Sequence, residues 1–228
     1  MKKILIIGAG SQSSINPEIK GIGTCLVELL SKRNVEILFT YFKSKEGAEN
    51  LKKIKSNAKI DAIKFNCLEY ERDWKNLELN IKKTEIPNIF IYNAGIRFYK
   101  KILTKEEKQS TLDVNYSCPL FLINKIGNLM AEKYKKGTII ITSSILAGKH
   151  HEFLEEYCYT KGLLDKYIQK NKANWQNKGI EIHTIYPNVT ITPMTEQRFD
   201  YYRNLVKEKK LKKLYTAKEV AKSIIKYI

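Results

Sequence analysis

The sequence has no long hydrophobic run. None of its apolar stretches approaches the roughly 18 residues that a membrane-spanning helix needs. The apolar part of the amino terminus, residues 4–7, is short and runs directly into glycines. It therefore predicts a first buried strand rather than a signal peptide.

Cysteines are few and widely separated in the chain. Cys25, Cys67, Cys118 and Cys158 include no pair at C-x-x-C spacing. The sequence therefore predicts no metal site and no disulfide framework. Free thiols are typical of a reducing compartment, so we expect a cytoplasmic protein.

Linkers, internal repeats and arginine-rich tracts are also missing. A chain of 228 residues without a linker predicts one domain over residues 1–228. The net charge of +17 comes from lysines spread along the whole sequence. This spread argues against nucleic acid as a partner and favours a basic rim around a site for an anionic ligand.

What is present is an alternation of apolar and amphipathic segments. The apolar stretches predict strands at residues 3–7, 35–40, 60–65, 89–93, 138–142 and 180–186. The segments with helical periodicity are residues 22–33, 45–56, 69–84, 106–134, 155–177 and 217–227. Alternation of this kind predicts an α/β fold, a doubly wound Rossmann-type parallel sheet of about six strands with helices on both faces.

Two glycine pairs surround the first turn. Gly8 and Gly10 follow the first strand, and Gly21-Ile22-Gly23 opens the first helix. The spacing matches neither G-x-G-x-x-G nor a P-loop, but the position suits a pyrophosphate at a helix N-terminus. Residues 12–20 are extra in this turn; they fold over the phosphates, meet a partner subunit or form a tolerated loop.

The end of the second strand bears on the choice of dinucleotide. A carboxylate there binds the ribose 2′-hydroxyl, whereas cations accept a 2′-phosphate. This segment offers Tyr41, Lys43 and Ser44 and no carboxylate. It favours NADPH over NADH, although solvated loop lysines would give the same pattern.

The segment from residue 142 to 164 carries the clearest chemistry. Tyr157 and Lys161 are four residues apart, so they share one face of a helix. An ammonium beside a phenol is expected to lower the pKa of the phenol and make it a general acid near neutral pH. Ser144, at the end of the fifth strand, can hold the same carbonyl oxygen.

Together these segments resemble the short-chain dehydrogenase/reductase family over almost the whole chain, including its β-ketoacyl carrier-protein reductases. Ser144 precedes Tyr157 by the family's usual interval of thirteen residues, and Asn115 falls where the family has a catalytic asparagine on a kinked helix. The matching motifs are Asn93-Ala94-Gly95, Tyr157-Cys158-Tyr159-Thr160-Lys161 and Pro187-Asn188-Val189-Thr190-Ile191-Thr192-Pro193-Met194.

The resemblance implies a role for each of these residues. Tyr157 would protonate a substrate carbonyl that receives hydride from NADPH, and Ser144 would orient that carbonyl. Lys161 would bind the nicotinamide ribose, and Asn115 would hold a water in a proton relay. Asn66 replaces the family's usual aspartate near the adenine. The expected cofactor contacts are Gly8, Gly10, Gly21, Ile22, Gly23, Tyr41, Lys43, Ser44, Asn66, Asn93, Ala94, Gly95, Tyr157, Lys161, Pro187, Val189, Thr190 and Thr192.

The chain also departs from the family pattern. Enoyl carrier-protein reductases also have a longer first turn, but their tyrosine lies seven residues before the lysine. Seven residues before Lys161 stands Leu154, so carbonyl reduction is favoured. The usual seventh strand is missing, which argues against the family's tetramer; a homodimer through helices 106–134 and 155–177 stays open. Residues 192–213 are expected to form a lid over the substrate.

Two substrate classes and a second function remain open. The substrate is either a β-ketoacyl group on an acidic carrier protein or a small polar or sugar-derived ketone of a biosynthetic pathway. Arg97 would meet an anionic substrate, whereas His150 and His151 are expected at the surface; Tyr201 and Tyr202 either cover the substrate or pack in the lid. The alternative function is a non-catalytic dinucleotide-binding redox sensor or scaffold.

Overall fold

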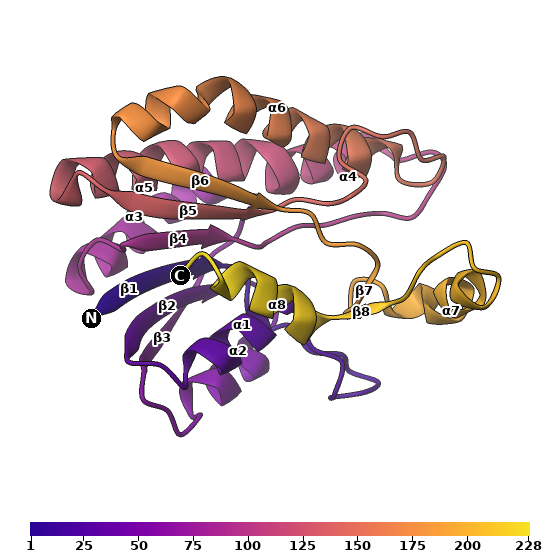
Figure 1. Ribbon diagram of the computed structural model, residues 1–228, viewed down its shortest axis with the longest axis horizontal. Helices are drawn as coiled ribbons and strands as arrows, with labels where there is room; N and C mark the ends of the chain where they lie inside the picture. Colours follow the sequence, from indigo (N-terminus) through magenta and orange to yellow (C-terminus); the bar gives the residue numbers. More distant parts are fainter.

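Six parallel strands form the central sheet of the computed structural model, which describes residues 1–228 (Figure 1). Their order, β3-β2-β1-β4-β5-β6, reverses direction between β1 and β4. The strands are β1 (Lys2–Ile7), β2 (Val35–Tyr41), β3 (Lys59–Lys64), β4 (Ile89–Tyr92), β5 (Gly137–Thr142) and β6 (Ile180–Ile185). The predicted doubly wound α/β fold is confirmed, and so is the absence of a seventh strand from this sheet.

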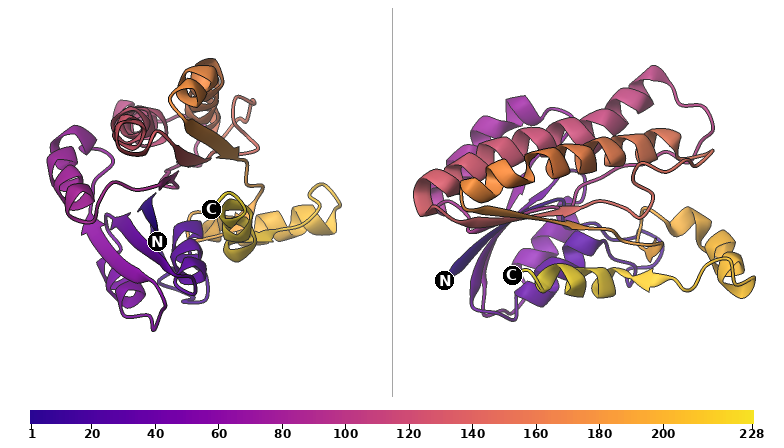
Figure 2. Two further views of the ribbon diagram at one scale, coloured as in Figure 1. Left: turned by 60° about the vertical axis from the view of Figure 1, so that its left-hand side comes forward. Right: turned by 45° about the horizontal axis from the view of Figure 1, so that its top comes forward.

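Helices cover both faces of the sheet, as the two views in Figure 2 show. One face carries α1 (Ile22–Leu30), α2 (Lys45–Lys52) and α8 (Ala217–Ile225). The other carries α3 (Tyr70–Lys83), α5 (Cys118–Tyr134) and α6 (Glu155–Asn177). None of the helices is both long and apolar enough to cross a membrane.

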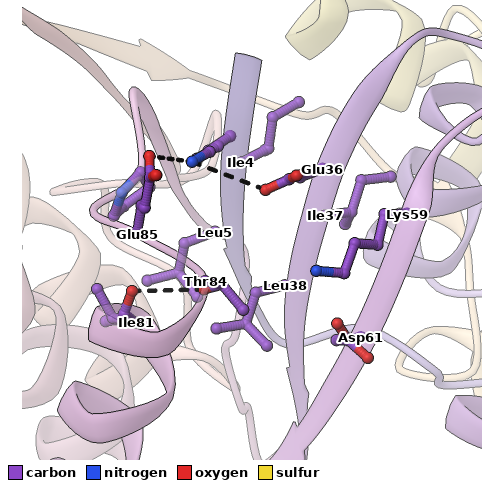
Figure 3. A pocket seen from close by; sticks show the side chains of 12 residues that line it. Ile4, Leu5, Glu36, Ile37, Leu38, Lys59, Asp61, Ile81, Thr84 and Glu85 are labelled. Atoms are coloured by element: carbon purple, nitrogen blue, oxygen red, sulfur yellow. Dashed lines mark hydrogen bonds and ion pairs between the residues drawn. The ribbon is translucent and has the colours of Figure 1, made fainter. Parts of the chain in front are cut away.

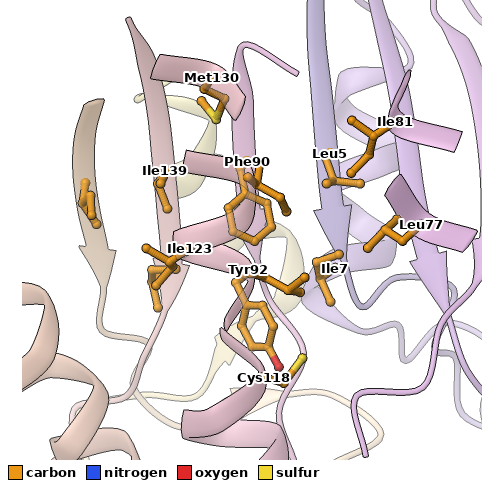
Figure 4. Packing of buried hydrophobic residues seen from close by; sticks show 14 of the residues in the cluster. Leu5, Ile7, Leu77, Ile81, Phe90, Tyr92, Cys118, Ile123, Met130 and Ile139 are labelled. Carbon is orange, nitrogen blue, oxygen red and sulfur yellow. The ribbon is translucent and has the colours of Figure 1, made fainter. Parts of the chain in front are cut away.

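The strands are apolar on both faces because each face is covered. In β1, Leu5 and Ile7 pack on the side of α3 and α5 (Figure 4). Ile4 and Ile6 pack on the side of α1 and α8. This two-sided burial explains why the strands appear in the sequence as continuous isoleucine-rich runs. Tyr92, fully buried in β4, donates its hydroxyl proton to the carbonyl of Val114 (2.6 Å) and so ties the sheet to the helical layer.

The segment predicted as one helix over residues 106–134 is broken near its middle. It consists of α4 (Lys105–Leu112), a π turn (Asp113–Ser117) and α5. Pro119 has no N–H, so the carbonyl of Asn115, four residues earlier, lacks its α-helical donor. The irregular turn therefore forms at Asn115.

The carboxyl-terminal part differs most from the sequence prediction. Beyond β6 the chain forms β7 (Thr190–Ile191), a 3₁₀ turn (Glu196–Arg198), α7 (Phe199–Lys207) and β8 (Tyr215–Thr216). β7 and β8 pair in parallel as a separate two-stranded sheet, which the sequence pattern did not indicate. The chain then returns along α8, which packs against α1.

The amino-terminal edge of the sheet offers no room for a large ligand. A cavity of about 20 Å³ lies there, between the first residues of β1, β2 and β3 (Figure 3). Lys3 forms ion pairs with Glu85 and Glu36 at this edge. Open α/β sheets usually bind their ligands at the opposite edge, where the strands have their carboxyl ends.

Candidate active site

A cavity of about 800 Å³ lies at the carboxyl ends of the strands, between the glycine turn and the lid segment, residues 192–213. It brings together most of the residues that the sequence singled out. Those that line it are Gly8, Gly21, Ile22, Tyr41, Lys43, Ser44, Asn66, Asn93, Ala94, Gly95, Ser144, Tyr157, Lys161, Pro187, Val189, Thr190 and Thr192.

The glycine turn has the features of a pyrophosphate site. Gly8 has φ +90°, and a Cβ there would lie 2.8 Å from the backbone of Ala94, so only glycine lets β1 and β4 end this close together. Gly21 is the N-cap of α1, and no side chain caps the helix. The first N–H groups of α1 are therefore available beside the cavity, and these residues fit the diphosphate of a dinucleotide.

Two predicted contact residues, Gly10 and Gly23, do not line the cavity. A Cβ on Gly23 would lie 2.1 Å from the carbonyl oxygen of Gly8, so this glycine lets α1 approach β1. Gly10 has φ +83° and packs against the N-terminus of α2, where a Cβ on Gly47 would lie 2.0 Å from its carbonyl oxygen. Both glycines shape the turn from behind.

The end of β2 presents cationic and hydroxyl groups to the cavity. Tyr41, Lys43 and Ser44 line it, and no carboxylate does. Ser44 is the N-cap of α2, but its hydroxyl makes no capping hydrogen bond, so it is available to a ligand. Asn66, at the end of β3, uses its Oδ1 to accept the N–H of Leu68 (3.0 Å) and keeps its amide donor.

Lys161 is a buried cation one helical turn after Tyr157 on α6. Its Nζ donates to the carbonyl of Thr142 (2.9 Å), at the end of β5. Burial lowers the pKa of Lys161 from its ordinary 10.5 to about 8, and the carboxylate of Asp165 opposes this shift. Lys161 is 3% exposed, and a pKa of about 8 favours its charged form at neutral pH.

The phenol of Tyr157 behaves differently from the sequence expectation. Burial raises its pKa, and a hydrogen bond with Ser144 and the charge of Arg97 oppose the rise. The prediction that Lys161 lowers this pKa was wrong for the protein alone, because desolvation dominates and the ammonium is bonded to Thr142. A raised pKa keeps the phenol protonated at pH 7, as a proton donor requires.

Asn115 lies behind the cavity in the π turn and is fully buried. Its side chain accepts the N–H of Ile96 (3.0 Å) and donates to the carbonyl of Ile96 (2.9 Å). A Cβ on Gly95 would lie 3.4 Å from Asn115 Oδ1 and 3.6 Å from Lys161 Nζ. Asn115 and Lys161 therefore flank the same backbone position, although Asn115 does not reach the cavity wall.

The extra residues of the first turn form a short hairpin beside the lid. Gln12 and Lys20 pair in antiparallel fashion, and none of residues 12–20 lines the cavity. Ser13, which is buried, donates its hydroxyl to the carboxylate of Glu196, with both carboxylate oxygens within 2.7 Å. Of the possibilities that the sequence left open, none included this contact with the lid.

The lid closes the cavity with residues that sequence reasoning found in part. Tyr201 and Tyr202 both line it. Leu205 and Leu211 also line it and were missed. The amphipathic pattern of residues 199–207 was the available signal, since Phe199 and Tyr202 form its buried side.

The polar residues of the opposite wall divide between cavity and surface. Arg97 and His151 line the cavity, and His151 is half-buried there rather than fully exposed. The ring of His151 packs edge-on against Tyr99, which holds it inward. His150 points outward and contacts Glu155 (3.0 Å), as expected.

A dinucleotide turn and a Ser-Tyr-Lys group in one cavity describe a nicotinamide-dependent enzyme, and comparison with known proteins agrees. The family model described as short chain dehydrogenase matches residues 2–203. The chain belongs to this family. It is an NAD(P)-dependent oxidoreductase that acts on a carbonyl or the corresponding alcohol.

Characterised members of the short-chain dehydrogenase family resemble the chain over most of its length. Glucose 1-dehydrogenase 2 of Bacillus subtilis (strain 168) is 23% identical over 210 residues, which cover 90% of this chain and 80% of that protein. L-rhamnose 1-dehydrogenase (NADP(+)) of Thermoplasma acidophilum is 22% identical and covers 82% of this chain and 76% of that protein.

Solved structures share the fold of this short-chain dehydrogenase. A 4-hydroxyisoleucine dehydrogenase complexed with NADH superposes with a TM-score of 0.85 at 19% identity, over 98% of this chain and 89% of that one. A 3-oxoacyl-[acyl-carrier protein] reductase from Brucella melitensis ATCC 23457 superposes with a TM-score of 0.82 at 18% identity, over 99% of this chain and 84% of that one.

Proposed function

We propose that the chain reduces the carbonyl of a small polar substrate with NADPH, and that Tyr157 is the proton donor. The observation that carries this proposal is the shared cavity: Ser144, Tyr157 and Lys161 line the same space as the glycine turn. Family membership does not favour the alternative of a non-catalytic redox sensor.

The reduced nicotinamide supplies hydride when the cofactor is bound. Tyr157 donates its phenolic proton to the carbonyl oxygen, and its raised pKa keeps that proton in place until transfer. Ser144, which lines the cavity together with Tyr157, holds the same oxygen as negative charge develops. Lys161 supplies a buried positive charge to the same cavity and would bind the nicotinamide ribose, and Asn115 holds the backbone of Ile96 next to Gly95, close to that ammonium.

A preference for NADPH rests on the end of β2. Lys43 and Ser44 line the cavity there without a carboxylate that would repel a 2′-phosphate. The name of the related L-rhamnose dehydrogenase includes NADP(+), whereas the structural neighbour named above contains NADH. We therefore base the preference on the side chains of this chain.

A charge change at Lys43 tests the cofactor preference. In Lys43→Gln, we expect the Kd of NADPH to rise about fivefold to tenfold and the Kd of NADH to change less than about twofold, because a charge-assisted hydrogen bond at an exposed site is worth roughly 1 kcal/mol. Lys53→Gln, an exposed lysine at the far end of α2, is the control. Tighter binding of NADH than of NADPH by the unaltered protein would contradict the proposal.

A small substrate is favoured over a carrier-bound acyl group because Tyr201, Tyr202, Leu205 and Leu211 of the lid line the cavity and partly close it. The relatives named above act on sugars according to their names. A carrier-bound β-ketoacyl group is the second candidate, since the net charge of +17 suits an acidic carrier and one structural neighbour is a 3-oxoacyl carrier-protein reductase.

The decisive experiment removes one hydroxyl from Tyr157. NADPH oxidation is followed by absorbance with a panel of ketones, ketose phosphates, keto acids and β-ketothioesters. Tyr157→Phe should lower kcat by at least about 100-fold, the usual contribution of a general acid, while the Kd of NADPH stays within about threefold. Tyr159→Phe, an exposed tyrosine on the same helix, is the matched control. Equal rates for the two variants would refute the mechanism.

A further inference from the structure

The charge of the cavity is one-sided. No aspartate or glutamate lines the cavity. Three cationic residues line it: Lys43, Arg97 and Lys161. Lys43 lies at the adenosine end and Lys161 beside Tyr157, where the dinucleotide accounts for both. Arg97 is the cation that the proposed cofactor does not explain.

Arg97 is placed at the reacting end of the cavity. It follows the Asn93-Ala94-Gly95 segment after β4 and lines the same cavity as Tyr157. The guanidinium lies near enough to the phenol for its charge to lower the pKa of Tyr157 against the effect of burial. A group bound by Arg97 and a carbonyl held by Tyr157 can therefore belong to one small molecule.

The protein does not neutralise Arg97. Its hydrogen bond to the chain runs from Nη2 to the carbonyl of Met194 (3.3 Å), and no carboxylate pairs with it. By contrast, Arg203 on α7 pairs with Asp200 (3.0 Å), outside the cavity. A guanidinium has five N–H donors in a planar fork that matches carboxylate and phosphate oxygens, and most of those of Arg97 remain unused.

A second unpaired arginine strengthens the positive field at this end. Arg198 stacks over the ring of Tyr99 (3.6 Å from the centroid) and also over that of Tyr201 (4.6 Å), a tyrosine that lines the cavity. Its Nε is buried and has no hydrogen-bond acceptor. Two cations without counterions beside a partly closed cavity raise the local concentration of anions.

We propose that the substrate is a small ketone, or its alcohol, that carries a carboxylate or a phosphate, and that Arg97 binds this anionic group while Tyr157 and Ser144 hold the carbonyl. The assignment rests on the reductase function proposed above. Arg97 thereby selects among substrates without taking part in proton or hydride transfer. Neutral sugars and carrier-bound thioesters are the substrates that it argues against.

Matched pairs of compounds test the assignment through kcat/KM. Each keto acid is compared with its methyl ester, and each ketose phosphate with the free ketose, with NADPH at saturation. We expect the best anionic compound to exceed its neutral partner by at least about 50-fold, as loss of a bidentate charged contact predicts. Which series contains that compound distinguishes carboxylate from phosphate.

Substitution of Arg97 locates the effect. Arg97→Gln should remove most of the preference for the anionic compound and leave kcat/KM of the neutral compound within about threefold. Arg97→Lys should restore part of the preference, and Arg203→Gln should leave kcat/KM of both compounds unchanged. Equal kcat/KM within every pair, an equal loss for both partners in Arg97→Gln, or a β-ketobutyryl-pantetheine thioester as the best substrate would overturn the proposal.

A binding measurement separates this proposal from the catalytic one. In Tyr157→Phe saturated with NADPH, malonate and inorganic phosphate are titrated by calorimetry, with and without Arg97→Gln. Binding of either anion that weakens at least about tenfold on loss of Arg97 supports the anion site even if no compound turns over. Anion binding that is absent, or unaffected by Arg97→Gln, refutes the anion site whatever the outcome for Tyr157.

Discussion

Replacing the buried Lys161 by methionine should stabilise the protein while it removes activity. Burial lowers the pKa of Lys161 from 10.5 to about 8. At about 1.36 kcal/mol per pH unit, this difference corresponds to roughly 3 kcal/mol of cost for holding the charged form in the fold. Methionine has a similar volume and no charge, but it leaves the carbonyl of Thr142 without its donor, which costs about 1 kcal/mol. We expect Lys161→Met to be about 2 kcal/mol more stable than the unaltered protein at pH 7.

The pH dependence identifies the cause of that gain. Below pH 8, both the folded and the unfolded protein keep the proton of Lys161, so the cost is present in full. Between pH 8 and 10.5, the unfolded state binds more protons, and the stability of the unaltered protein rises with pH. The advantage of Lys161→Met should therefore shrink by about 2 kcal/mol between pH 7 and pH 9.5.

Urea unfolding at several pH values between 6 and 9.5 measures this difference. Lys166→Met, an exposed lysine on the same helix, is the control and should show no such trend. An advantage of Lys161→Met that stays constant with pH, or a variant that is less stable at every pH, would refute the reasoning. In the first case the gain would come from packing, and in the second the bond to Thr142 would outweigh the cost of the buried charge.

Three further predictions concern the lid, the glycine turn and the phenol. Ser13→Ala leaves the carboxylate of Glu196 without its hydrogen-bond donor, so amide exchange over residues 196–207 should speed up about tenfold, and KM should rise with little change in kcat. The control, Ser14→Ala at an exposed neighbour, should change neither amide exchange nor KM. Gly23→Ala places a Cβ 2.1 Å from a backbone oxygen of the first turn, so urea unfolding should reveal a loss of about 2–3 kcal/mol together with weaker NADPH binding. Because burial raises the pKa of Tyr157, carbonyl reduction should vary less than about twofold between pH 6 and 8, whereas alcohol oxidation, which needs the phenolate, should rise with pH; a steep fall of reduction over this range would contradict the assigned acid.

The sheet and most of the site could be predicted from the sequence because both depend on local patterns. Each strand is buried on two faces, so its apolar run is continuous and easy to recognise. The residues at the strand ends, such as Ser144 and Lys43, follow directly from the positions of those strands. The motif spacing around Tyr157 holds because it lies within one helix and its preceding loop.

Other features depend on tertiary contacts and had no local signal. The direction of the Tyr157 pKa is set by desolvation in the assembled cavity, not by the neighbouring lysine in the sequence. The strands β7 and β8 contain two residues each and pair across more than twenty residues, too little for any periodicity. The break at Asn115 did have a signal in Pro119, four residues later, but one proline inside a predicted helix does not by itself identify a π turn.

Several features of the cavity are unfavourable for folding and favourable for binding an anion. The fold holds Lys161 at a reduced pKa, leaves Arg97 without a carboxylate and keeps the N-terminus of α1 without a capping side chain. A sequence selected for stability alone would place an acid or a cap at each of these positions. A dinucleotide and an anionic substrate would together supply partners at these positions, so binding would recover free energy that the fold gives up. That all three lie along one cavity, from the glycine turn to the lid, is the strongest physical reason to regard it as a single site for a dinucleotide and an anionic substrate.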